Sequence, residues 1–404
     1  MTGVEALPAL PLPAGVRSRV VVGVNGLAMH VLEAGFDTPE EGRDRPCVLL
    51  LHGFPEIAYS WRKVMKPLAD AGYHVLAPDQ RGYGRTRATG ASGWQVDYDA
   101  DLAPVRFTNL ALDALALVNA CGYRQVACVV GHDFGSPVAA WCALIRPDVF
   151  RSVVLMSAPF AGPASLPFGA ANAAATANAP AVDIHAALAT LPRPRKHYQW
   201  YYGTRPANDD MLHCPQGVQA FLRAYYHHKS ADWAGNAPAP LAGYRAEELA
   251  KLPTYYVMDH ARTMPETVAE VMPTASEIAA CEWMRDDEMR VYADEYTRTG
   301  FQGGLQWYRS SAHPQFASEL RLFSGRTIDV PSMFVGGRSD WGVYQTAGAF
   351  ERMQKSACTN MRECHLLDGA GHWVQQEQAV KVSELLVGFI DQTCRDDGKG
   401  TARP

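Results

Sequence analysis

The chain has 404 residues, of which 48% are hydrophobic and 20% are charged, and it carries a formal net charge of −5 at pH 7. This length is sufficient for a large core and predicts one large domain with an insertion, or two domains. The charge gives no sign of nucleic-acid or anionic-membrane binding, and no apolar stretch is long enough to span a bilayer.

The nine cysteines form no C-x-x-C pair and no zinc-like spacing. Their odd number, and the apolar runs around several of them, indicate reduced thiols. The N-terminal segment has a glutamate and three prolines but no basic region before an apolar run, so it does not resemble a signal peptide. We therefore expect a cytoplasmic protein without a structural zinc site.

The first part of the chain alternates between predicted strands and predicted helices. Residues 19–35 alternate around Asn25-Gly26, which is a strong signal of a β-hairpin. Continuous apolar runs then predict buried strands, and helical periodicity predicts helices. In chain order these are a strand at 46–54, a helix at 60–72, a strand at 73–84, a helix at 107–123, a strand at 125–134, a helix at 135–147 and a strand at 150–160.

The alternation stops after Phe160 and resumes near the C-terminus. Residues 161–192 are rich in Ala, Pro and Gly, which predicts a long connection with some helix, and the chain from 194 to 321 is aromatic and helix-like. The pattern is then completed by a strand at 328–341, a helix around 347–354, a strand at 361–373 and a helix at 380–392, before a tail that we expect to be frayed.

This order of elements predicts an α/β fold with a mostly parallel sheet and helices on both of its faces. The simplest division is a core formed by residues 1–160 and 326–404, interrupted by a helical cap at 161–325. We find no internal repeat in the sequence.

The sequence GHDFG at 131–135 places Asp133 between a predicted strand and a predicted helix. The spacing G-x-nucleophile-x-G is typical of a strand-to-helix turn whose central residue projects from the sheet. The glycines leave room for the backbone, and the helix N-terminus favours a carboxylate. Asp133 is therefore a candidate nucleophile toward an sp3 carbon, with a simple helix N-cap as the alternative.

Two further residues complete a candidate catalytic triad. Nucleophile-elbow hydrolases place nucleophile, acid and base in this chain order, each after a strand. Asp340 follows the apolar strand in MFVGGRSDW, and His372 follows the next strand in HLLDGAGHW. Asp368 competes with Asp340 for the role of the acid, because it closely precedes His372.

The sequence LLHGFPE at 50–56 ends another core strand and is a candidate oxyanion-hole loop. We expect one backbone amide from Phe54 and a second from Phe134, the residue after the nucleophile. The remaining supporting or pocket-lining candidates are His52, Glu56, Trp61 and Trp341. A place in the first turn of a helix is the alternative for Glu56, and core packing is the alternative for Trp61.

Together these motifs resemble the epoxide hydrolase branch of the α/β-hydrolase fold. The resemblance is carried by HGFPE with Ser60-Trp61 shortly after it, DQRGYG, GHDFG, SDW and GAGHW, which cover most of the predicted core. In the cap, RTGFQGGLQWYR resembles the family segment whose tyrosine points into the site, which assigns Tyr308. HYQWYYG resembles the segment of its partner and assigns Tyr198, although Tyr201 and Tyr202 lie about one helical turn away and compete with it.

The resemblance implies a two-step hydrolysis of a small apolar epoxide by water. In the first step Asp133 would attack a ring carbon, while Tyr198 and Tyr308 assist the ring oxygen, giving a hydroxyalkyl ester on the enzyme. An ester on Asp can be hydrolysed at its own carbonyl, whereas the ether that a Ser would form cannot. No metal or organic cofactor is implied.

In the second step His372, oriented by Asp340, would take a proton from the water that attacks the ester. The amides of Phe54 and Phe134 would bind the oxyanion. The family further suggests that Glu56 helps a water or proton path.

Three alternatives stay open. Haloalkane dehalogenases resemble HGNPT with a Trp after the Asp nucleophile, and haloacetate dehalogenases carry an Arg there, whereas this chain has HGFPE and Phe134. A serine esterase would need a Ser at position 133, and Ser136 lies one helical turn too late. A non-catalytic ligand receptor on the same scaffold is the alternative from a different class.

The predicted cap is longer than a compact family cap, through residues 161–192 and 254–284. This length leaves pocket shape and substrate preference open. Caps contribute to dimer contacts in related proteins, so a homodimer is among the expectations.

Overall fold

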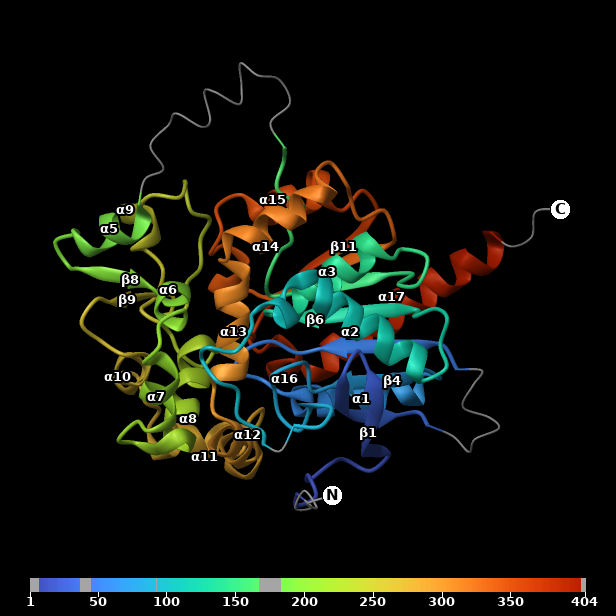
Figure 1. Ribbon diagram of the computed structural model, residues 1–404, viewed down its shortest axis with the longest axis horizontal. Coiled ribbons are helices and arrows are strands. Elements are labelled where there is room, and N and C mark those ends of the chain that lie inside the picture. The colour runs from blue at the N-terminus through green and yellow to red at the C-terminus, as the bar shows by residue number, and fades with distance from the viewer. Residues whose placement is uncertain (1–6, 37–44, 92, 167–182, 401–404) are drawn as a thin grey trace.

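The computed structural model describes residues 7–36, 45–91, 93–166 and 183–400. These residues form two parts that lie side by side in Figure 1. One part is a sheet flanked by helices, and the other is a mostly helical part built from the chain between strands β7 (Val153–Met156) and β10 (Ser332–Gly337).

The described residues form a nine-stranded sheet in the order β1-β2-β4-β3-β6-β7-β10-β11, with β5 paired to β2. The pairs β1–β2 and β2–β4 are antiparallel, and the pairs from β4 across to β11 are parallel, which confirms the predicted hairpin and the mostly parallel sheet. The remaining strand bounds are β1 Val16–Val24, β2 Leu27–Ala34, β3 Cys47–Leu51, β4 His74–Pro78, β5 Arg87–Ala88, β6 Cys128–His132 and β11 Met361–Leu367.

Helices cover both faces of the sheet, as predicted. Because side chains alternate along a strand, Val48 and Leu50 of β3 enter one hydrophobic cluster while Leu49 and Leu51 enter the other. The first cluster includes side chains of α1 (Arg62–Asp70) and α17 (Ala379–Gly400), and the second includes side chains of α2 (Phe107–Ala120) and α3 (Gly135–Ile145). The expectation of a frayed tail is wrong as far as Gly400, because α17 continues to that residue.

The second part is helical, as predicted, with one exception. A short antiparallel ribbon joins β8 (Arg195–His197) to β9 (Val257–Asp259), and the local sequence of neither segment reveals a pairing over such a distance. The helices are α5 Ile184–Ala189, α6 Tyr198–Tyr202, α7 Ala207–Leu212, α8 Gly217–Lys229, α9 Ala246–Leu249, α10 Met264–Ala269, α11 Ala275–Ala280, α12 Asp286–Thr299, α13 Gln302–Ser311 and α14 Pro314–Glu319.

The connection predicted for 161–192 falls mostly on residues 167–182, which lie outside the described residues. The division into 1–160, 161–325 and 326–404 stays our proposal, and we call 161–325 the cap below. Short elements complete the core: the 3-10 helices η1 Ala58–Trp61, η2 Ala103–Val105 and η4 Trp341–Val343, the π-helix η5 Met353–Ala357, and helices α15 Ala349–Arg352 and α16 Val374–Glu377. The 3-10 helix η3 Leu320–Phe323 ends the cap.

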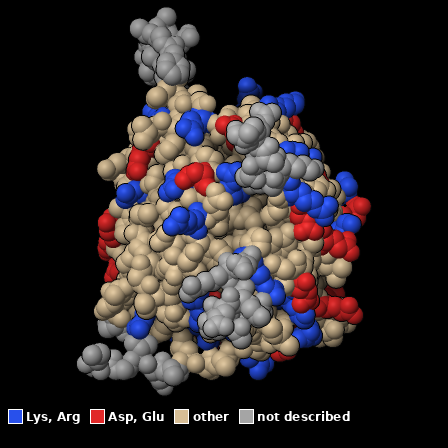
Figure 2. Space-filling view, turned by 90° about the vertical axis from the view of Figure 1, so that its right-hand side faces the viewer, with Lys and Arg blue, Asp and Glu red and all other residues tan. Residues whose placement is uncertain are grey.

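Within the described part of the chain, no helix is long and apolar enough to cross a membrane. On the face shown in Figure 2, basic and acidic side chains are interspersed, and neither sign forms a large continuous block. This distribution is in keeping with the small net charge of −5.

Candidate active site

A sharp turn between β6 and α3 carries Asp133. Its φ of 51° lies in the left-handed region, which few non-glycine residues adopt. A Cβ on Gly131 would lie 2.0 Å from the carbonyl oxygen of Gly135, and one on Gly135 would lie 2.3 Å from that of Leu51. Because only hydrogen fits at both positions, the two glycines are required for the turn that holds the carboxylate at the edge of the sheet.

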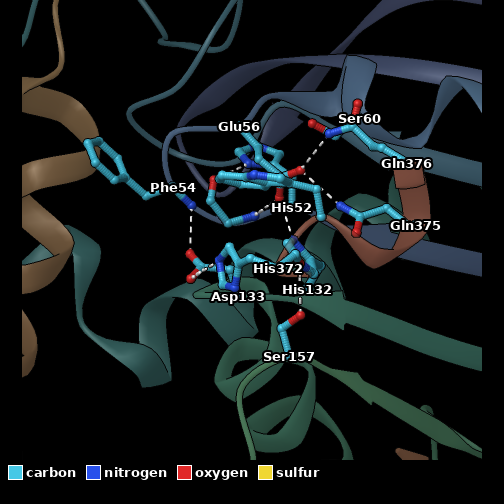
Figure 3. A network of polar contacts seen from close by, with 12 residues as sticks. His52, Phe54, Glu56, Ser60, His132, Asp133, Ser157, His372, Gln375 and Gln376 are labelled. Carbon is cyan, nitrogen blue, oxygen red and sulfur yellow. Dashed lines mark hydrogen bonds and ion pairs between the residues drawn. The ribbon is translucent and has the colours of Figure 1, made fainter. Parts of the chain in front are cut away.

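The structure brings Asp133, His372 and Asp340 together, although they are far apart in the sequence (Figure 3 shows the first two). His372 lies between β11 and α16, and its Nε2 is 3.1 Å from Oδ2 of Asp133. Its Nδ1 is 3.1 Å from Oδ1 of Asp340, which follows β10. The imidazole therefore bridges two carboxylates, an arrangement in which a base is oriented toward a nucleophile.

Asp368, the competitor for the role of the acid, lies elsewhere. Its carboxylate pairs with Arg338, and its side chain is 84% exposed. Asp340 is 1% exposed, accepts a hydrogen bond from the amide of Gly342 at 2.7 Å, and is the carboxylate that contacts His372. The geometry thus favours Asp340 as the residue that orients the base.

Both carboxylates are held ionised although they are buried. Burial raises the pKa of Asp133, but the hydrogen bond from His372 and the charges of His372, Lys229 and His132 outweigh it and hold the pKa below its usual range. Burial likewise raises the pKa of Asp340, but the charge and hydrogen bond of His372, the amide of Gly342 and the charge of Lys229 together hold it below its usual value. The ionised form is the one in which a carboxylate can act as a nucleophile.

The backbone amides at Phe54 and Phe134 flank the Asp133 carboxylate. The amide of Phe54 donates to Oδ1 of Asp133 at 2.8 Å, as Figure 3 shows. The amide of Phe134 has no acceptor among the described residues. A Cβ on Gly53 would lie 2.4 Å from Oδ1 of Asp133, so a glycine there allows the loop to approach the carboxylate.

Tyr308 lies against both of these phenylalanines. Its ring is 5.0 Å from that of Phe134 and 5.6 Å from that of Phe54, edge to face in both cases. Its side chain is 5% exposed, and its hydroxyl has no hydrogen-bond partner within the described part of the chain. α13 therefore brings a free phenol from the cap to the side of the site where Asp133 lies.

Tyr198 and Tyr202 both lie beside Tyr308, and Tyr198 stays our assignment for the second phenol. Its ring is 5.9 Å from that of Tyr308, and its hydroxyl donates to Gln345 at 3.2 Å. The Tyr198 hydroxyl also accepts a hydrogen bond from Gln199 at 3.2 Å. Tyr201 donates to Asp210 at 2.7 Å, and Tyr202, whose ring is 5.1 Å from that of Tyr308, donates to Tyr225 at 3.4 Å.

Burial, and next the charge of Asp133, raise the pKa of both Tyr198 and Tyr308 well above the usual value. Both phenols are therefore protonated at neutral pH and available as hydrogen-bond or proton donors.

Glu56 lies in a fully buried network behind the triad (Figure 3). Its Oε2 is 2.6 Å from Nδ1 of His132, and its Oε1 accepts hydrogen bonds from Gln375 at 2.9 Å and Gln376 at 3.2 Å. Burial raises the pKa of Glu56 and lowers that of His132, but the contact between them reverses both shifts, so the pair is stabilised in its charged form.

His132 was not among the predicted site residues, although it stands next to Asp133 in GHDFG. Its Nε2 lies 2.7 Å from the backbone carbonyl of His372 and 3.1 Å from Oγ of Ser157. The pair of Glu56 and His132 thus supports the segment that carries His372. The position of His132 next to Asp133, at the strand-to-helix turn, is the sequence signal that would have identified it.

The other supporting candidates occupy different places. Nε2 of His52 accepts a hydrogen bond from the amide of Gln80 at 3.0 Å, so its ring braces the loop that carries the Phe54 amide. Trp341 is 8% exposed and belongs to the same hydrophobic cluster as Phe54 and Tyr308. Trp61 is fully buried in the cluster on the other face of the sheet, so its assignment to the pocket is wrong and the core-packing alternative holds.

Metal ligation has no support among the residues that the structure describes, where no group of three or more His, Cys, Asp and Glu side chains could hold a metal ion. The chemistry that the site can perform with its own side chains is a nucleophilic attack by Asp133, assisted by phenols and followed by base catalysis.

Comparisons with known proteins agree with this geometry. A model of the alpha/beta hydrolase fold matches residues 46–250. The chain is 30% identical over 398 residues to epoxide hydrolase A of Mycobacterium tuberculosis, covering 93% of this chain and 98% of that protein. It is also 30% identical over 373 residues to an epoxide hydrolase of Caballeronia sordidicola, covering 91% of this chain and 92% of that protein.

Solved structures give the same result. An epoxide hydrolase from an endophytic Streptomyces superposes with a TM-score of 0.70 at 28% identity, covering 94% of this chain and 96% of that chain. Potato epoxide hydrolase I superposes with a TM-score of 0.68 at 27% identity, covering 93% of this chain and 99% of that chain. The similarity therefore extends over the core and the cap together.

Proposed function

The chain belongs to the epoxide hydrolase family of the α/β-hydrolase fold, and we propose that it opens its epoxide through a covalent ester on Asp133. The observation that carries this proposal is the position of the Asp133 carboxylate between two groups. Phe54 donates its amide to Oδ1, and His372 contacts Oδ2. Oδ1 is thereby held in the position that the carbonyl oxygen of the ester would take, and Oδ2 faces His372.

In the first step, a lone pair of Oδ2 attacks a ring carbon and the ring C–O bond breaks. The electron pair goes to the ring oxygen, which takes a proton from a phenol. Tyr308 is our assignment for this donor, because its hydroxyl is free and its ring lies against Phe54 and Phe134. Tyr198 hydrogen-bonds the same oxygen.

The charge of Asp133 also tunes these phenols. It raises the pKa of both tyrosines while the carboxylate is ionised. Formation of the ester removes this charge, so the phenols become stronger acids at the moment when the alkoxide needs a proton.

In the second step, water attacks the Cγ of the Asp133 ester. Nε2 of His372 takes the proton of this water, and Asp340 stabilises the imidazolium that forms. The oxyanion on Oδ1 stays at the amide of Phe54 and gains the unbonded amide of Phe134, and removal of one such donor typically costs ~3 kcal/mol. When the Cγ–Oδ2 bond breaks, the imidazolium of His372 returns its proton to Oδ2, which leaves in the vicinal diol. The second proton of the water, left on the new carboxyl group, passes to the phenolate, so that Asp133 is again ionised.

The substrate that we propose is an epoxide with an apolar body. Aromatic side chains beside the nucleophile support this class, since Phe54, Phe134, Trp341 and Tyr308 belong to one hydrophobic cluster or pack against it. A homodimer and a cytoplasmic location stay predictions, and the mass of the protein in solution tests the first of them.

Trapping the ester tests the mechanism. His372→Gln should allow the first step and block the second, so the intact-protein mass rises by the mass of one styrene oxide after exposure. Asp133→Asn is the matched control, because the amide retains the shape but cannot attack, and its mass should not change. A His372→Gln protein without an adduct, in a preparation whose wild type forms diol, would contradict the covalent route.

A further inference from the structure

A buried lysine lies close to the triad. Lys229 is the last residue of α8, and its side chain is 2% exposed. Its backbone carbonyl accepts the amide of His372 at 2.8 Å, so the end of this cap helix rests on the segment that carries the base. By the usual distance criteria, no carboxylate of the described residues lies within 4.0 Å of its ammonium, and none of their acceptors hydrogen-bonds it.

Aromatic rings surround this ammonium on several sides. Nζ of Lys229 is 4.9 Å from the ring centre of Tyr256, 5.4 Å from that of Trp373, 5.3 Å from that of Tyr225 and 5.8 Å from that of Tyr255. Such rings attract a cation but do not replace the oxygen acceptors that its three N–H groups require.

Two of these rings link the ammonium to the reacting groups. The ring of Trp373 is 4.7 Å from that of His372, and the ring of Tyr256 is 5.1 Å from that of Tyr198. Trp373 therefore contacts both the ammonium and His372, and Tyr256 contacts both the ammonium and Tyr198.

Burial and the charges of nearby carboxylates act on this lysine in opposite directions. Burial lowers the pKa of Lys229, and the charges of Asp133, Asp340 and Glu56 oppose that shift. Burying an ammonium without an acceptor is costly. An oxygen atom supplied by a ligand would remove this cost, and a neutral oxygen does so without adding a further negative charge beside three carboxylates.

We propose that Lys229 binds an oxygen substituent of the substrate, so that the preferred epoxide carries a hydroxyl or carbonyl oxygen on the carbon next to the ring. This inference rests on the proposed function and deepens it. The apolar body of the substrate lies against the aromatic cluster, and the oxygen substituent reaches toward the cap side of the site.

A pair of substrates that differ by one oxygen tests this proposal. trans-3-Phenylglycidol carries a CH₂OH where trans-β-methylstyrene oxide carries a CH₃. In the wild type we expect kcat/KM for the alcohol to exceed that for the hydrocarbon by about tenfold, the size of one good hydrogen bond to a charged donor. trans-3-Phenylglycidate, measured in parallel, shows whether a carboxylate is accepted as well.

In Lys229→Met the ratio of the two kcat/KM values should fall to about one, and in Lys229→Arg it should recover in part. The matched control is Lys251→Met, which removes an exposed cap lysine and should retain the wild-type ratio. If Lys229→Met does not fold, as judged by near-UV circular dichroism, Lys229→Gln replaces it, and its ratio should fall as well.

Two outcomes would overturn the inference. One is a wild-type ratio near one, and the other is a lysine variant that slows both substrates by the same factor. The second result would make Lys229 only a counter-charge for the buried carboxylates. Failure of the proposed function is distinguishable from both, because then neither substrate would give a diol.

Discussion

A carboxylate nucleophile suits epoxide opening because it forms an ester, which water can hydrolyse at its carbonyl. In the mechanism that we propose, Asp133 forms an ester, and the oxygen that becomes its carbonyl, Oδ1, is already held by the amide of Phe54. The group that stabilises the resting carboxylate is thus in place for the oxyanion of the second step, and no rearrangement is needed between the two steps.

Removing one phenol should slow the first step. In Tyr308→Phe we expect the rate of ester formation, measured in a single turnover, to fall by about 10²-fold, because a proton donor to the developing alkoxide is lost. Substrate binding should change little, since the ring and its contacts with Phe54 and Phe134 remain.

Tyr201→Phe is the matched control for this experiment. Tyr201 is a neighbouring cap tyrosine whose hydroxyl is bound to Asp210. The two variants should differ in rate, and equal rates would mean that the free hydroxyl of Tyr308 does not assist the ring oxygen.

At the residue scale, the sequence predicts the parts of the site that have local signatures. Asp133 is recognisable because two glycines and a strand-to-helix change surround it, and the structure explains both glycines by close backbone contacts. Lys229 has no such signature, because its proximity to His372 arises from the packing of the cap on the core. Trp61 was misassigned because a residue close to a motif in the sequence can still pack on the opposite face of the sheet.

At the scale of elements, the site depends on how closely α13 approaches the core. Figure 1 shows this helix between the sheet and the cap helices α6, α7 and α8. A Cβ on Gly303 would lie 1.8 Å from the carbonyl oxygen of Gly82, and one on Gly304 would lie 2.6 Å from the ring of Phe54. These two glycines set the distance at which Tyr308 stands from the nucleophile.

Gly303→Ala should therefore damage both stability and the first step. We expect the free energy of unfolding, measured with urea, to fall by about 2–3 kcal/mol, because backbone atoms have to move apart. The rate of ester formation should fall as well, since α13 carries Tyr308 away from the site.

The control is Gly388→Ala in α17, where a Cβ meets no atom within 4 Å. This helix-interior change should raise the free energy of unfolding by ~1 kcal/mol and leave the rate unchanged. A Gly303→Ala protein as stable and as fast as the wild type would contradict the role that we give to this contact.

The elements themselves were largely predictable, because periodicity is a local property. The hairpin at Asn25-Gly26 and the strands that precede Asp133, Asp340 and His372 were placed correctly. The ribbon of β8 and β9 was not, since its pairing joins segments that are distant in the chain. The end of α17 was missed because polar residues near a terminus suggested fraying.

At the scale of the whole molecule, buried polar contacts join the cap to the core. Arg62 of α1 pairs with Glu288 of α12 at 2.8 Å, and Arg85 pairs with Glu295 of the same helix at 2.8 Å. Tyr296 donates to the carbonyl of Glu56 at 3.1 Å. These contacts depend on tertiary packing, so the sequence indicated a cap but not its orientation.

The stability of the molecule should depend on pH through Asp79, at the end of β4. This buried carboxylate contacts His30 at 2.7 Å and accepts the amides of Ala58 and Arg85, each at 2.8 Å. Burial raises its pKa, but these contacts outweigh burial and lower the pKa from 3.8 to about 2. A depressed pKa adds stability above the unfolded value, and this stability is lost as the pH falls through about 2.

Asp79→Asn isolates this contribution. The difference in the free energy of unfolding between wild type and variant should shrink by about 1.5 kcal/mol between pH 5 and pH 2.5, as urea titrations at each pH can measure. A difference that is constant over this range would mean that the carboxylate is not held ionised by the fold.

The most direct test of the central claim follows oxygen atoms through a single turnover in H₂¹⁸O with enzyme in excess over styrene oxide. If water attacks the ester of Asp133, the diol takes its new oxygen from the carboxylate, and the label enters the enzyme. We therefore predict an unlabelled diol and a peptide around Asp133 that is heavier by one ¹⁸O. A diol labelled in the first turnover, with an unlabelled peptide, would mean that water attacks the epoxide directly and would contradict the covalent mechanism.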